Sequence, residues 1–429
     1  MTVLAAVLGV VLLAARPPAS APTAAPEASA SPVPVLPPIP TASPENALTP
    51  IFTYTGEAAA NPSGGVRQGT AYADQLLLGF DFNLARLIGV AGGTIHFDVT
   101  HRAGNDLATD DIGNNTSVQE IYGGQGWHLA IISYEQLLFH DKLDVEAGRI
   151  PANVSFAHSA IYCVFQTNSA CANPPFVFTN SNFTYYPASG WGVHAKALLT
   201  DRIFLHVGAY ASNTDPANAG FNFNMSHTTG PIVPAEAGYS TTFANDTHPR
   251  NYVIGGWYDD SIYTNPSGVV ERGRSALYVR FDQLITRPSL ASQRGLTLFG
   301  VAMSNLSGNV VESDYEEIGL VQTGTFARRD HDTLGFVIND QHFTKDTLAA
   351  LQAARLAAGG TATVPSRETM MELAYGIQVS HGIQISPNLQ YVVDPDQLND
   401  SARVRNVKNA FVVGLHFSVD IASLLARHH

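Results

Sequence analysis

The chain has 429 residues, a net charge of −13 and a mean hydropathy of +0.02. The negative charge argues against a nucleic-acid-binding protein, which would present a basic surface. Many Gly residues and few charged ones are typical of a β-rich chain with loops, and one β-barrel can take up this length.

The N-terminus predicts export. Residues 3–15 form an apolar run of signal-peptide length, and residues 19–21 (ASA) fit the small-x-small cleavage rule. We therefore expect a signal peptide at 1–21. Residues 22–49 are rich in Pro, Ala and Ser, which bury little apolar surface, so this stretch is expected to be a disordered linker. The apolar run is shorter than the ~20 residues of a spanning helix, so membrane insertion of the mature chain requires strands.

Beyond the linker, apolar and polar residues alternate with a period of two, as they do in strands with one apolar and one polar face. Sixteen segments are expected to be strands: 51–60, 67–82, 92–101, 127–139, 142–151, 188–199, 202–211, 231–241, 251–259, 274–285, 295–304, 315–325, 331–341, 367–380, 383–394 and 407–421. An even number is typical of bacterial single-chain barrels. We therefore predict an all-β fold, a transmembrane antiparallel barrel over 50–421, followed by a tail at 422–429.

The connections between these segments are sorted by length. Tight turns follow the fourth, sixth and fourteenth segments, whereas long connections follow the fifth, seventh, ninth, thirteenth and fifteenth. Outer-membrane barrels have short periplasmic turns and longer outer loops. A soluble sandwich has no reason to sort its loops in this way, so the pattern favours the barrel.

The hairpin 367–394 illustrates what the two faces mean. Leu373 and Leu389 belong to its apolar face, and Glu368 and Glu372 to its polar face. In a soluble sandwich the apolar face would lie in the core, but in an outer-membrane barrel it contacts lipid and the polar face lines the lumen. The same alternation predicts that Arg280 points into the lumen, and likewise Asp282.

One charged residue breaks the alternation. Arg149 shares the predicted lipid face of Val145 and Ala147. Either the strand ends there at the membrane boundary, or a bulge turns the side chain inward.

The loop 151–187 is the longest one inside the barrel region and is rich in rings and amides. An apolar loop of this kind is poorly placed in open water. We therefore expect it to fold into the lumen and narrow the channel. Asn180, Phe183 and Tyr185 are the candidates for contact with a solute, although packing against the wall explains most of the rings. The loop also carries Cys163 and Cys171, and a disulfide between them suits an exported protein, the alternative being two free thiols.

At this point the residues resemble a known family. The stretches that carry the resemblance are SYEQLLF (133–139), LDVEAGR (143–149), YYP (185–187), GGWY (255–258), ETMMELAY (368–375) and NLQYVV (388–393). In order and spacing they are similar to stretches of the carbohydrate-selective porins of the OprB family. The resemblance extends over residues 50 to 421. It implies a sixteen-stranded channel in the outer membrane of a Gram-negative bacterium that lets glucose and related small sugars diffuse inward. Within the matching motif, Glu135 and Arg149 are the candidates for the constriction.

The resemblance implies neither a reaction nor a cofactor, and the sequence predicts no metal site. The expected partners are small sugars, outer-membrane lipid and lipopolysaccharide, with the barrel a monomer or a homotrimer. Two other functions stay open: a general solute pore with little preference for sugars, and a lipid-modifying barrel enzyme. No Ser and His pair stands in a distinctive catalytic motif.

Overall fold

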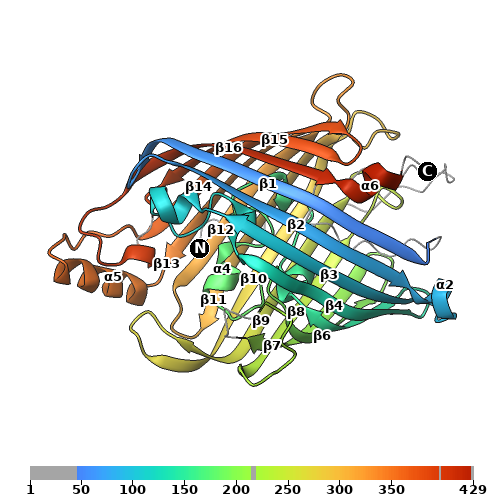
Figure 1. The fold of residues 1–429 in the computed structure, drawn as a ribbon, viewed down its shortest axis with the longest axis horizontal. Coiled ribbons are helices and arrows are strands. Elements are labelled where there is room, and N and C mark those ends of the chain that lie inside the picture. Colours follow the sequence, from blue (N-terminus) through green and yellow to red (C-terminus); the bar gives the residue numbers. More distant parts are fainter. Residues whose placement is uncertain (1–45, 214–218, 396–397, 427–429) are drawn as a thin grey trace.

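The computed structural model describes residues 46–213, 219–395 and 398–426. Within them, sixteen strands close into one antiparallel barrel, in which each strand pairs with its neighbours in sequence and β1 pairs with β16 (Figure 1). This confirms the predicted fold class and strand number. The predicted signal peptide and most of the predicted linker lie outside the described residues. Helix α6 occupies most of the predicted tail.

The barrel strands have the following bounds: β1 Leu48–Gly65, β2 Thr70–Asn83, β3 Gly93–Gly104, β4 Gly126–Leu138, β5 Leu143–Ile150, β6 Gly190–Leu198, β7 Ile203–Asn213, β8 Thr228–Ser240, β9 Arg250–Thr264, β10 Val270–Thr286, β11 Gly295–Ser307, β12 Glu312–Thr323, β13 Thr333–Phe343, β14 Arg367–Ser380, β15 Ile383–Val393 and β16 Lys408–Asp420. The helices and helical turns are α2 Leu84–Ile88, η1 Ala108–Ile112, η2 Glu120–Tyr122, α3 Ala152–Ser155, η3 Tyr162–Val164, α4 Pro175–Thr179, α5 Lys345–Ala357, η4 Leu398–Asp400 and α6 Ile421–Ala426. None of the helices in the described ranges is long and apolar enough to cross a membrane.

The two ends of the barrel differ in their connections. Helix α5 lies at one end, with the longest loops, whereas α2 and α6 lie at the other (Figure 1). The turn after β14 belongs to this second end and contains Gly382, whose φ of +81° favours a residue without a Cβ. Because outer-membrane barrels carry their short turns on the periplasmic side, we assign the end with α2 and α6 to the periplasm.

The predicted length of one connection is wrong. The long connection expected after the ninth strand is a short hairpin turn, because β9 extends to Thr264 and β10 already starts at Val270. The two strands continue to pair beyond the predicted limit, with Tyr263 opposite Glu271. The Tyr263 hydroxyl donates a hydrogen bond of 2.8 Å to the Glu271 carboxylate, which supports this extension.

The two faces of each strand have the environments that the alternation predicts. In the hairpin of β14 and β15, Leu373 and Leu389 are 44% and 43% exposed on the outer face. Glu368 and Glu372 point the opposite way and are buried. In a barrel that stands in lipid, the exposed apolar side chains contact acyl chains and the carboxylates lie inside.

The outer face yields a stability prediction at Leu389. Leu389→Arg is expected to destabilise the barrel by about 2–4 kcal/mol, because a charge near the bilayer midplane loses its hydration. Urea titration of protein folded into lipid vesicles measures this difference. Leu389→Phe, which keeps an apolar side chain in lipid, is the control and is expected to stay close to the parent. Equal stability of the two variants would contradict a lipid environment for this face.

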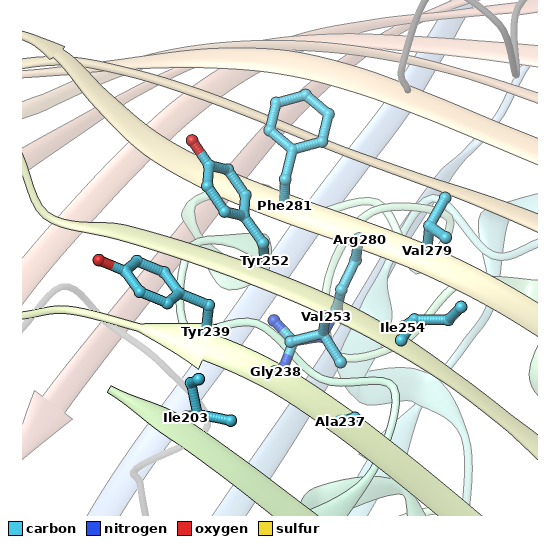
Figure 2. A pocket seen from close by; sticks show the side chains of 10 residues that line it. All are labelled: Ile203, Ala237, Gly238, Tyr239, Tyr252, Val253, Ile254, Val279, Arg280 and Phe281. Atoms are coloured by element: carbon cyan, nitrogen blue, oxygen red, sulfur yellow. The ribbon is translucent and has the colours of Figure 1, made fainter. Parts of the chain in front are cut away.

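The outer face also has an apolar groove of about 410 Å³ across β7 to β10, shown in Figure 2. Tyr239 and Tyr252 lie at its periplasmic end, with ring centroids 6.4 Å apart. Phe281 and Arg280, neighbours in β10, point to opposite sides of the strand (Figure 2). The pair of tyrosines is typical of the aromatic belt that barrels place at the level of the lipid headgroups.

Candidate functional site

Two connections between strands fold back into the barrel. We call residues 105–125, between β3 and β4, the first inner segment, and residues 151–189, between β5 and β6, the second inner segment. Phe156 and Phe176 of the second segment are buried in one cluster with inward side chains of the wall. The predicted in-folded loop is therefore confirmed.

Sequence reasoning missed the first inner segment. Its apolar side chains form a buried cluster with β14, β15 and β16: Leu107, Ile112 and Val118 pack with Met370, Val392, Ala410 and Val412. The available signal was the presence of these apolar residues in a loop that is otherwise polar. The two inner segments also bond to each other, because the Glu120 amide donates to the Gln166 carbonyl and the Asn168 amide to the Ser117 carbonyl, both at 3.0 Å.

Carboxylates of the wall hold the second inner segment in place. The two oxygens of Glu372 accept hydrogen bonds of 2.8 Å from the amides of Gln166 and Thr167. Glu236 accepts one of 3.0 Å from the Ala157 amide. Hydrogen bonds to a charged acceptor are stronger than those between neutral groups. These inward carboxylates therefore fix the course of the segment through the lumen.

Similar contacts hold the remaining parts of both segments. Asp259 accepts a hydrogen bond of 2.9 Å from the Asn182 amide. Glu57 accepts one of 3.2 Å from the Ile121 amide, and Glu368 one of 3.4 Å from the Asn115 amide. The inner wall thus offers acceptors, and the inner segments supply the backbone donors that a loop would otherwise leave without partners.

Several predicted solute contacts are instead used to anchor the second inner segment. The Asn180 amide group donates to the Glu312 carbonyl at 2.8 Å and accepts from the Glu312 amide at 3.0 Å. Phe183 packs edge-on against Trp257 of β9, with ring centroids 5.6 Å apart. The Tyr185 hydroxyl bonds to the backbone of Asn173 inside the same segment. All three side chains thus have partners within the protein.

Arg280 and Asp282 lie together on the inner side of β10. Their nearest charged atoms are 3.9 Å apart, and Arg280 is buried whereas 26% of the Asp282 side chain is exposed. The Ser159 hydroxyl of the second inner segment donates to Asp282 at 3.2 Å, and the Asn251 amide group does so at 3.3 Å. The pair therefore contacts both the wall and the inner segment.

A disulfide joins Cys163 and Cys171 within the second inner segment. Tyr162 and Phe165 beside it pack near Phe299 of the wall, with ring centroids about 6 Å apart. The bridge therefore closes a short loop that lies against β11. Among the described residues, no group of three or more His, Cys, Asp or Glu side chains is arranged to hold a metal ion.

The two constriction candidates lie on opposite faces of the wall. Glu135 points inward, 3.4 Å from the His96 ring, with 13% of its side chain exposed. Arg149 is paired with Trp191 of β6, and paired residues share one face of the sheet. Val193, two residues after Trp191 and therefore on the same face, is 43% exposed on the outside of the barrel, so Arg149 points outward. The expectation that Arg149 lines the lumen is therefore wrong.

The reason lies in the pairing of β5, which runs through Arg149 without a register shift on either side. No bulge turns the side chain inward, and the strand ends at the next residue. The Arg149 guanidinium donates hydrogen bonds to the carbonyls of Ser189 and Asn222, at 2.6 and 3.0 Å, and lies over the Phe223 ring. Two backbone acceptors and a ring thus contact this outward charge at the rim of the barrel, while its Nε has no hydrogen-bond partner in the described structure.

Sequence reasoning also missed a network of histidines and carboxylates on the inner wall. His194 of β6 contacts Glu146 of β5 at 2.9 Å and His206 of β7 at 3.1 Å. His206 in turn lies 3.8 Å from Glu236 of β8. The alternation of 188–199 and 202–211 contained the signal, because it places both rings on the inner side.

A set of charged side chains of both signs remains accessible on the inner wall near the periplasmic end. Lys196 is exposed, and Glu135, Asp144 and Asp282 are partly exposed. Accessible donors and acceptors beside a narrowed lumen bind polar solutes weakly, which a channel needs because the solute must also leave.

Three comparisons place this architecture among known proteins. A family model described as "Carbohydrate-selective porin, OprB family" matches residues 67–420. Porin B of Pseudomonas aeruginosa is 29% identical over 394 residues, covering 84% of this chain and 85% of Porin B. Putative porin QuiX of Acinetobacter baylyi is 26% identical over 388 residues, covering 84% of this chain and 86% of that protein.

A solved structure agrees with these two relatives. The high-pH structure of Pseudomonas putida OprB matches with a TM-score of 0.78 and 27% identity, over 87% of this chain and 94% of that one. The family model covers most of the barrel, and the observed fold is that of the matched structure. The chain belongs to the OprB family of carbohydrate-selective porins of the bacterial outer membrane.

Proposed function

We propose that the sugars carried by this porin are glucose and related small neutral sugars, and that the second inner segment sets the size limit. The observation that carries the proposal is the way in which the segment is held across the lumen by carboxylates on three separate strands. Glu236, Asp259 and Glu372 each accept a backbone hydrogen bond from it. A loop held at these three points narrows the lumen.

The accessible inner charges support a preference for neutral polyhydroxylated solutes. Sugar hydroxyls both donate and accept, so Lys196 and the carboxylates of Glu135, Asp144 and Asp282 all offer suitable partners. Weak and reversible hydrogen bonds of this kind raise the local concentration of a sugar without trapping it. Of the candidates named from the sequence, Glu135 and Asp282 keep this role here. Asn180, Phe183, Tyr185, Glu368 and Glu372 instead hold the inner segments.

The setting of this function is the outer membrane of a Gram-negative bacterium. The outward apolar side chains would contact phospholipid on the periplasmic side and lipopolysaccharide on the outer side, and the barrel would act as a monomer or as a homotrimer. No reaction is needed for such transport, because the concentration gradient of the sugar drives its entry.

Swelling of proteoliposomes and planar-bilayer conductance test the proposal. Glucose is expected to enter faster than an uncharged polyol of equal size, and millimolar glucose is expected to reduce the ion current. Entry rates that follow solute size alone, without any block of the current by sugar, would instead indicate a general solute pore. Sustained hydrolysis of phospholipid that disappears on a single Ser substitution would indicate a lipid-modifying enzyme.

A further inference from the structure

The start of the second inner segment rests on the pair of histidines on the inner wall. The Phe156 ring stacks on His206 with centroids 4.0 Å apart and planes inclined by 16°, and it meets His194 edge-on. The Ser155 hydroxyl lies 3.2 Å from His194 Nε2. Gly208 leaves room for the Phe156 ring, because a Cβ at this position would lie 2.9 Å from it. Both imidazoles therefore contact the segment directly.

The pair is enclosed between two carboxylates. His194 Nε2 lies 2.9 Å from Glu146 Oε2, and His206 Nδ1 lies 3.8 Å from Glu236 Oε2. Glu236 also accepts hydrogen bonds from the Ala157 amide and from the Tyr278 hydroxyl. All four charged or imidazole side chains are less than a tenth exposed. The row therefore connects four adjacent strands with the first turn of the segment.

The contact between the two rings limits the number of protons that the row can hold. His206 Nε2 and His194 Nδ1 are 3.1 Å apart, so one of these nitrogens donates a hydrogen and the other accepts it. Carboxylates next to the outer nitrogens favour a hydrogen on each of them, so a hydrogen between the rings is a third one, and one of the two rings then carries a positive charge. If both imidazoles are protonated, two N–H groups oppose each other and two positive charges lie about 5 Å apart.

Other charged groups near the pair do not remove this constraint. Besides Glu146 and Glu236, Asp144 and Lys196 interact electrostatically with the two histidines, whereas His96 interacts with Glu146 and Arg280 with Glu236. None of these four side chains has a hydrogen bond to either ring in the described structure. They change the electrostatic potential at the two rings. The number of hydrogens between the rings is instead limited by the short distance between the facing nitrogens.

From this geometry we propose that His194 and His206 are positioning residues for sugar passage. They hold the start of the second inner segment while one hydrogen is shared between the two rings, and they release the segment when both rings become protonated. The proposal rests on the proposed role of the segment as the constriction. Phe156 loses its stacking partner and Ala157 its ordered acceptor when the rings separate. The lumen then changes shape on acidification, while the barrel wall stays closed.

The experiment uses the full-length porin in lipid and measures the order of the segment and the conductance of the pore separately. Hydrogen exchange of the peptide 152–160 is measured from ~pH 7.5 to ~pH 5, which brackets the ordinary histidine pKa of about 6.5. The protection factor, corrected for the intrinsic effect of pH on exchange, is expected to fall on the order of tenfold, the equivalent of one lost hydrogen bond. Single-channel current and its block by glucose are recorded over the same range.

Three variants make the test specific. His194→Gln and His206→Gln each leave one imidazole next to an amide group, whose oxygen can accept a hydrogen bond from the protonated ring. In both variants the fall in protection of the peptide 152–160 on acidification is therefore expected to disappear. His96→Gln is the control, because His96 bonds to Asp81 and Glu135 at 2.7 and 3.4 Å without touching either inner segment, and its fall should match that of the parent.

A fall that persists in both glutamine variants, or no fall in the parent protein, would overturn the proposal. A fall in protection without any change in current or in glucose block would keep the histidines as anchors of the segment, but would refute its role as the constriction. Loss of folding in one variant is covered by the other, because each removes the facing N–H groups from a different strand.

Discussion

Glu372→Gln is expected to widen the channel for solutes larger than a disaccharide. The substitution keeps the shape of the side chain but replaces one acceptor oxygen by an NH2 group, which opposes the amide of Gln166 or Thr167. One hydrogen bond to a charged acceptor, worth about 1.5–3 kcal/mol, is lost, and a buried donor is left without a partner. Because every ~1.4 kcal/mol is a factor of ten in an equilibrium, the population of the displaced state of the segment is expected to rise roughly 10- to 150-fold.

Swelling rates of proteoliposomes with a series of oligosaccharides measure this effect. Glu316→Gln is the matched control, because Glu316 is on β12, is only partly buried and lies 3.4 Å from His342, away from the inner segments. We expect the size limit to move upward in the Glu372 variant alone. An unchanged size limit would show that the hydrogen bonds to Gln166 and Thr167 are not what restricts the lumen.

Trp257→Ala is expected to have the largest effect on the stability of the second inner segment. The indole is 4% exposed and packs against Phe176 and Phe183, with centroid distances of 6.0 and 5.6 Å. Truncation of a buried Trp to Ala costs about 3–5 kcal/mol, because transfer energy is lost and a cavity is left. The loss acts on the contact between α4 and β9, so local opening of the peptide 174–186 is expected before the barrel itself unfolds.

The neighbouring residue provides the control for this prediction. Tyr258 follows Trp257 in β9 but points outward and is 50% exposed, so Tyr258→Ala leaves the inner segment untouched. Hydrogen exchange of the peptide 174–186 is expected to accelerate in the Trp257 variant and to stay unchanged in the Tyr258 variant. The same acceleration in both would indicate a general weakening of β9 and would contradict a specific contact with α4.

The barrel was predictable because each face of its strands meets one environment only. Lipid on the outside selects apolar residues and water on the inside tolerates charged ones, so a period of two is sufficient to count the strands and to orient them. Alternation alone assigned Arg280, Asp282, Glu368 and Glu372 to the inner wall, where the structure has them. For Arg149 the pattern also pointed outward, and the error arose from the motif-based inference that set this pattern aside.

The inner segments were only partly predictable. The apolar residues of 151–187 indicated that this loop lies inside the barrel, but those of 105–125 were overlooked. Sequence patterns do not contain the contacts of such a loop, because its partners are far away along the chain. Glu372 and Thr167, for instance, are separated by 205 residues. Consequently Asn180, Phe183 and Tyr185 were predicted to meet a solute, whereas the structure uses them as anchors.

What the sequence by itself determined about this protein is therefore the wall: the number of strands, the direction of their side chains and the family to which they belong. Only the tertiary structure decided which inward groups stay accessible to a solute and which hold the inner segments. The physical reason is that alternation is a local consequence of a two-sided environment, whereas closing the barrel brings residues of distant strands within hydrogen-bonding distance. His194 and His206 illustrate both levels, since alternation turns the two rings inward and pairing of β6 with β7 joins them.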